Sequence, residues 1–142
     1  MITDAQLRFS DNQSLAVVAA TTLATNVVDL LTNKGNLGIG ASRRVLAQIT
    51  TAFAGGTSVR AELIESAASD MSSPTVLFAG PTLTDANAVI GARLLDVVIP
   101  TSAKRYVGVR YITVGDHTAG KVFAGIVLDT DHQPYPAINT GR

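Results

Sequence analysis

The stretch that decides the fold is RVLAQITTAFAGGTSVRAELIES, residues 44–66. Side chains in 44–53 and 58–66 alternate between two faces, as they do on a β-strand. In the second run the two faces are well separated, with Val59, Ala61 and Leu63 on one side and Arg60, Glu62 and Ile64 on the other. Gly55-Gly56 lies between the runs, and two glycines between strand patterns indicate a hairpin. The stretch therefore predicts two antiparallel strands joined by a tight turn.

The same kind of pattern recurs along the chain, and no segment keeps a helical period. Short extended runs separated by Gly, Pro, Ser and Asp clusters are predicted at 26–31, 75–79, 94–99, 104–114 and 121–129. The last two runs are expected to pair across the turn at 115–120, whereas 83–93 suits either a helical turn or a loop. The expected fold is all-β, an antiparallel β-sandwich of seven to eight strands. The pattern alone leaves an immunoglobulin-like arrangement and a jelly roll open.

Composition and charge limit the possible functions. Hydrophobic residues make up 46% of the 142 residues and charged residues 15%, which indicates one globular domain rather than a disordered chain. Eleven basic residues balance eleven acidic ones, so no overall field attracts a polyanion, and we expect no nucleic-acid partner. Cysteine is absent, which excludes disulfides and thiolate metal sites. The longest apolar run near the N-terminus, residues 15–20, is too short to span a bilayer, so no membrane association is expected.

The segment KRYVGVRYITV, residues 104–114, interleaves basic and aromatic residues, a pattern that single-stranded nucleic-acid binders use. On a strand, however, Tyr106 and Tyr111 point to opposite faces and cannot form one stacking platform. An ordinary half-buried strand is the better interpretation.

No set of residues indicates catalysis. His117 falls in a predicted turn, and His132 ends the sequence DTDH, where a metal site is conceivable but a solvated strand end is the simpler interpretation. Glu62 and Glu65 fall on opposite faces of a strand, which argues against a glycosidase pair. The glycine-rich residues 35–40 lack the following helix that a nucleotide cradle needs. We predict no catalytic, cofactor or metal residues, and a protein that is not an enzyme.

Candidate contact residues fall into two groups. The basic pairs Arg43-Arg44 and Lys104-Arg105 stand at predicted strand starts, where they either protect a sheet edge or contact an acidic partner. The division of the chain expected here is one β-sandwich domain over 1–131, with an N-terminal arm over about 1–14, and an extended tail over 132–142. Apolar residues on the arm and the tail suit docking onto another subunit, although Leu7 and Phe9 equally suit the end of the core; the set is Ile2, Leu7, Phe9, Tyr135, Pro136 and Ile138.

Several motifs, in this order and spacing, resemble the cement, or decoration, proteins of tailed bacteriophages, of the Bordetella-phage-like short-tailed type. They are FSDNQSL (9–15), SDMSSPT (69–75), GARLL (91–95), the KRY that ends at Tyr106, and HTAGKVFAGIVLD (117–129). The resemblance covers the chain up to about Asp131, and the tail after it looks particular to this sequence.

The resemblance implies a jelly-roll-like sandwich that performs no reaction. Such a protein is made in the cytoplasm of the host bacterium and binds the outer capsid surface of the virion. There it clamps neighbouring copies of the major capsid protein against the pressure of packaged DNA. A homodimer is the expected oligomer and a trimer the alternative. The competing hypothesis is a carbohydrate- or receptor-binding module on the virion surface, but the chain has no Trp to stack on a sugar.

Overall fold

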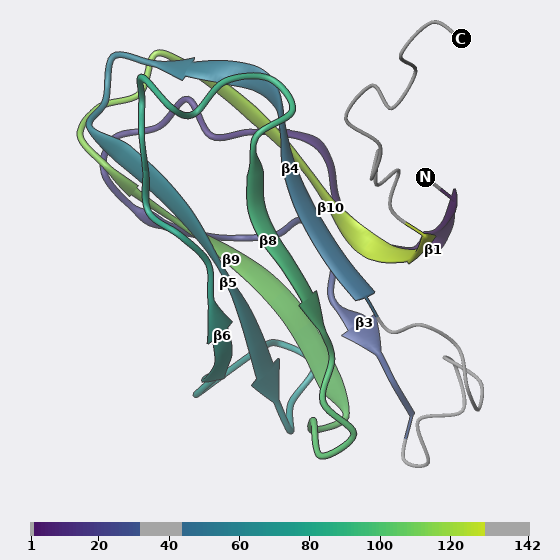
Figure 1. Ribbon diagram of the computed structural model, residues 1–142. Coiled ribbons are helices and arrows are strands. Elements are labelled where there is room, and N and C mark those ends of the chain that lie inside the picture. The colour runs from purple at the N-terminus through teal and green to yellow at the C-terminus, as the bar shows by residue number, and fades with distance from the viewer. Residues whose placement is uncertain (1, 32–43, 130–142) are drawn as a thin grey trace, which may run out of the picture.

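The computed structural model describes residues 2–31 and 44–129, and its regular structure there is entirely antiparallel β (Figure 1). The expected all-β fold is therefore confirmed. Small and β-branched side chains favour the pleated surface of a sheet, which accounts for the extended conformation of these segments. The strands are β1 (Ile2–Ser14), β2 (Thr21–Leu23), β3 (Val28–Asp29), β4 (Arg44–Ala54), β5 (Ser58–Ser66), β6 (Thr75–Ala79), β7 (Leu83–Thr84), β8 (Arg93–Val98), β9 (Tyr106–Val114) and β10 (Ala119–Asp129).

The strands form two sheets packed face to face, with the order β1-β10-β4-β8 in one and β2-β9-β5-β6 in the other. We call these sheet A and sheet B. The two-residue strands β3 and β7 add to sheet B beside β9 and β5. The eight longer strands, counted in chain order, run 1-8-3-6 and 2-7-4-5, which is the order of a jelly roll. The jelly-roll expectation is confirmed. The described residues form ten strands rather than the seven to eight expected, and the two-residue strands β3 and β7 make up the difference.

Both predicted hairpins are wrong, because each predicted turn connects strands of different sheets. β4 pairs with β10 and β8, whereas β5 pairs with β9, β6 and β7. Each connection is an arch that crosses from one sheet to the other. The arches are stacked, with the Thr57 amide bonding the Val114 carbonyl at 2.7 Å and the Thr118 amide bonding the Ala54 carbonyl at 2.8 Å. Left-handed glycines, Gly55 (φ 88°) and Gly115 (φ 82°), permit the sharp bends, and the same residues would also have suited a hairpin.

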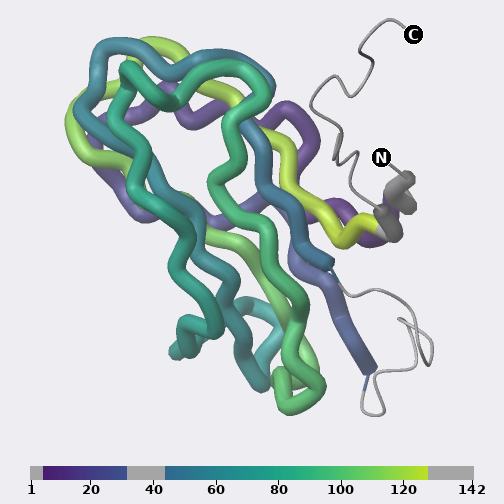
Figure 2. The backbone as a smooth tube through the Cα atoms, in the orientation of Figure 1, coloured from purple at the N-terminus to yellow at the C-terminus, as the bar shows by residue number. Residues whose placement is uncertain are grey.

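Four connections cross between the sheets at one end of the sandwich. They are residues 15–20 after β1, 55–57 after β4, 85–92 before β8 and 115–118 after β9. Figure 2 shows the tube turning at this end, in the upper part of the view. We call it the arch end. The connections after β5 and β8 lie at the other end, which also holds β3.

The predicted N-terminal arm is also wrong, because residues 2–14 form β1, the edge strand of sheet A. β1 pairs with β10 from Ile2 opposite Asp129 to Ser14 opposite Lys121, with four register shifts along the way. The Gln13 side chain bonds the Leu23 carbonyl at 3.0 Å, and the Asn26 side chain bonds the Arg8 carbonyl at 3.0 Å. These bonds fasten the segment around residues 23–26 against β1.

The core between the sheets is built from small aliphatic side chains and a few rings, including Phe9, Phe53 and Tyr111. The Tyr111 hydroxyl crosses from sheet B to bond Ser10 of sheet A at 2.9 Å, and Ser10 in turn bonds Gln13 at 2.6 Å. Burial raises the pKa of the Tyr111 phenol. Because Tyr111 is fully buried, it cannot stack on a base, and the strand interpretation of 104–114 is confirmed.

Candidate interaction surfaces

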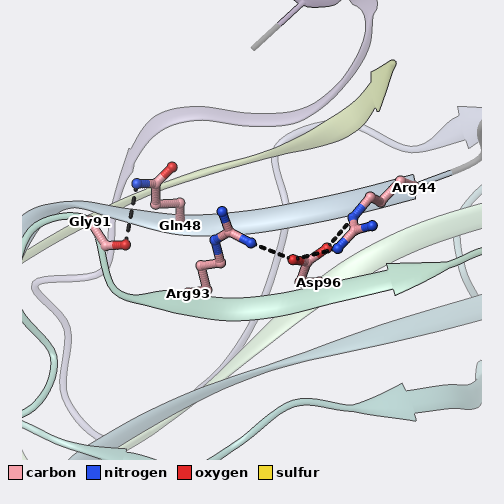
Figure 3. A network of polar contacts seen from close by, with 5 residues as sticks. All are labelled: Arg44, Gln48, Gly91, Arg93 and Asp96. Carbon is pink, nitrogen blue, oxygen red and sulfur yellow. Dashed lines mark hydrogen bonds and ion pairs between the residues drawn. The ribbon is translucent and has the colours of Figure 1, made fainter. Parts of the chain in front are cut away.

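Arg44 and Arg93 converge on Asp96 across β4 and β8, at the edge of sheet A (Figure 3). Arg44 donates from Nε and Nη2 to the two carboxylate oxygens, the second bond being 2.9 Å, and Arg93 Nη1 donates at 2.6 Å. The hydrogen bonds from Arg44 are the main reason that the pKa of Asp96 lies below its usual 3.8. Charges on an edge strand discourage pairing with another chain, so this cluster suits edge protection. Arg44 is thus engaged within its own chain.

We expect Asp96→Asn to lower the free energy of unfolding at pH 7 by about 1–2 kcal/mol, because two guanidinium groups lose their charged acceptor. The folded-state pKa of Asp96 is depressed, so its contribution is present above pH 3.8 and is lost as the pH falls through the folded value. Urea unfolding at neutral and acid pH should show the gap to the wild type closing on acidification. The control, Asp11→Asn, removes a more exposed ion pair with Arg8 and should cost under about 0.5 kcal/mol. A gap that stays constant with pH would contradict this account.

The second predicted basic pair lies at the end opposite the arches. Arg105 donates two hydrogen bonds to the Asp29 carboxylate, of 2.9 and 2.8 Å, and its guanidinium lies 5.0 Å from the centre of the Tyr106 ring. These hydrogen bonds hold the pKa of Asp29 below its usual value. The Lys104 amide bonds Glu65 at 2.8 Å, and its ammonium group bonds Thr75 at 3.2 Å. Both basic residues are exposed, as a rim position requires, but each also fastens its own loop.

Sequence reasoning missed a charged cluster on the outer face of sheet B. Glu62 is only 3% exposed and accepts one bond of 2.7 Å from Arg60 and one of 2.7 Å from Arg110. The register places Arg110 of β9 opposite Glu62, a pairing that no local pattern predicts. The two arginines cover the carboxylate, and so they compensate its loss of hydration. The cluster fixes β5 against β9.

His117 lies in the connection 115–118 at the arch end, and its side chain is buried. Its Nε2 lies 2.9 Å from Asp85 Oδ1, while the other oxygen of Asp85 accepts the Gly56 amide at 2.9 Å. The imidazole meets the Phe53 ring edge-on, with centres 5.2 Å apart. The His117 amide bonds the Val17 carbonyl at 3.0 Å. His117 thus links all four connections of this end: its side chain bonds Asp85, Asp85 bonds the Gly56 amide, and the His117 amide bonds Val17.

The remaining predicted contact residues divide into four cases. Phe9 is 1% exposed and packs in the core, which favours the core interpretation of the two given for it. Leu7 is partly buried and packs against the same core. Ile2 pairs through its backbone with Asp129. The others lie outside the described residues, namely Arg43, Tyr135, Pro136, Ile138 and the whole predicted tail, 132–142.

Within residues 2–31 and 44–129 no three His, Asp or Glu side chains gather as metal ligands would. Most of the DTDH sequence lies beyond this range. The described part of the chain also contains no helix long and apolar enough to cross a membrane.

The structure thus defines the class of protein as a jelly-roll sandwich in which polar clusters link its own strands. The family model Bbp16, a Bordetella phage protein family, matches residues 9–126, which covers most of the chain and every long strand except parts of β1 and β10. The chain belongs to the Bbp16 family and is a phage protein. A comparison with curated proteins finds no match.

Proposed function

We propose that this protein is a capsid decoration protein, or cement, that binds the outside of an icosahedral phage head. On the shell it clamps neighbouring subunits of the major capsid protein and stabilises the head against the pressure of packaged DNA. It performs no reaction, needs no cofactor, and binds neither nucleic acid nor membrane. It acts as a small homo-oligomer, with a dimer favoured over a trimer.

The observation that carries the proposal is membership of the Bbp16 phage protein family together with a jelly-roll sandwich fold. A cement has to be rigid, and here both sheets are cross-linked by ion pairs and by the Tyr111–Ser10 bond. A formal net charge of zero lets many copies cover one shell without repelling one another. Several weak contacts on neighbouring subunits then add up to firm retention.

The test is co-sedimentation of the purified protein with expanded, undecorated shells assembled from the major capsid protein of the same phage. We expect saturable binding, and shells that resist heating better once they are decorated. Single-stranded DNA is the negative control and should leave the protein in the supernatant. Failure to co-sediment with the shells at micromolar concentration would contradict the proposal.

A further inference from the structure

The arch end carries three of the four most exposed large hydrophobic side chains among the described residues. Its largest exposed side chains are aliphatic, with Val18 70%, Val89 51% and Ile90 69% exposed. Val18 stands on the β1–β2 connection, and the other two stand on the connection before β8. The exposed residues around them are mostly small, namely Ala16, Ala19, Ala20, Ala54, Gly55, Ala86 and Gly91. By the order of sheet A, these two connections stand at opposite sides of the arch end, with the arches after β4 and β9 between them. Exposed apolar side chains spread over one end of a protein mark an interaction surface, and small residues between them let a partner's backbone come close.

Charge separates the two ends of the sandwich. The four connections of the arch end contain no Lys or Arg, and Asp116 is their only exposed charged residue, since Asp85 is engaged with His117 and Gly56. The described connections at the opposite end carry the exposed residues Asp70, Lys104 and Arg105 among several Ser and Thr. The arch end is therefore suited to contact with another protein, whereas the charged opposite end is suited to exposure to solvent.

Hydrogen bonds and ring packing also hold the backbone of the arch end in one conformation. Val17 and Ala88, the neighbours of the exposed valines, are held by backbone bonds to His117 and to Phe53, of 3.0 Å each. The side-chain rings of His117 and Phe53 also pack against each other. A Cβ on Gly56 would lie 2.3 Å from the imidazole, so the arch sits directly on the ring. A surface held in one conformation before binding loses little entropy when a partner docks.

We infer that the arch end is the surface that docks on the shell, with Val18, Val89 and Ile90 as its apolar anchors. This inference rests on the proposed function, and it names the partner as an apolar protein surface that carries one basic group opposite Asp116. A second copy packed head to head is a poorer occupant, because the two Asp116 carboxylates would then approach each other. A lipid surface is poorer still, since interfacial membrane binding draws on Lys, Arg and aromatic side chains, and these connections expose none.

The experiment compares three proteins on the same undecorated shells: the wild type, the double variant Val18→Ser/Ile90→Ser, and Val98→Ser. Val98 is the matched control, because it is a 57% exposed valine at the end of β8, away from the arches. We expect the control to bind as the wild type does. The double variant should bind at least about tenfold more weakly, since two buried aliphatic contacts are lost. All three should melt at similar temperatures, because the changed side chains are exposed.

Three results would overturn the inference. If the wild type binds and the double variant binds equally well, the arch end is not the docking surface, although the proposed function stands. If sedimentation velocity shows that the double variant loses a dimer that the wild type forms, a second copy covers this end. If the wild type, but not the double variant, floats with phosphatidylcholine–phosphatidylglycerol vesicles, the partner is a lipid surface. A wild type that binds no shells is a separate outcome, and it counts against the proposed function itself.

Discussion

Gly80→Ala should destabilise the fold by about 3 kcal/mol or more and lower the melting temperature by about 10 °C. Gly80 directly follows β6, and its amide bonds the Ala61 carbonyl at 2.9 Å. A Cβ at this position would meet the Leu94 carbonyl oxygen of β8, a backbone atom, at 1.9 Å. Backbone cannot turn aside as a side chain can, so the edges of the two sheets would have to separate.

The matched control for this prediction is Gly108→Ala in β9. A Cβ there would meet the flexible end of Met71 at 3.2 Å, and neither glycine has a left-handed backbone. Repacking one methionine should cost less than about 1 kcal/mol. Thermal unfolding followed by circular dichroism measures both variants, and soluble yield serves where Gly80→Ala does not fold. Equal stability of the two variants would show that the approach of β6 to β8 is not tight.

How far the sequence predicts this fold depends on whether a feature is local. Alternation of side chains found the strands at 44–54, 58–66 and 106–114, because period two belongs to a single strand. Pairing depends on residues far apart, and a Gly-Gly turn serves an arch as well as a hairpin, so Gly55 and Gly56 suggested the wrong partner for β4. The ion pair of Glu62 could not be predicted for the same reason, since Arg110 reaches it from another strand.

β1 escaped detection for a different physical reason. Its four register shifts break the alternation on which strand prediction depends, and Asn12 takes a left-handed φ of 52°. Polar residues such as Asp11 therefore fall among apolar ones without a period, and the segment resembled an arm. For the basic pair Lys104-Arg105 the position was predicted but the partners were not. Both residues lie at a rim, as expected. Asp29 and Glu65, which bond them, are far away in the sequence, so no local pattern indicates these contacts.

Phe9→Ala should cost about 3–5 kcal/mol of unfolding free energy, because it removes a ring that is 1% exposed and leaves a cavity between the sheets. The partly buried Leu7 gives the matched control, and Leu7→Ala should cost about 1 kcal/mol, in proportion to the smaller area it buries. Urea unfolding measures both values.

Shell binding by Phe9→Ala separates the two roles that an apolar residue near a terminus can have. A docking residue contributes only in the complex, so its removal would leave unfolding unchanged and weaken co-sedimentation. A core residue contributes before any partner arrives, so the fraction of Phe9→Ala that remains folded should bind shells as tightly as the wild type. The reverse pattern, a stable variant that no longer binds, would return β1 to the role of an arm and would place the docking surface along the edge of sheet A instead of at the arch end.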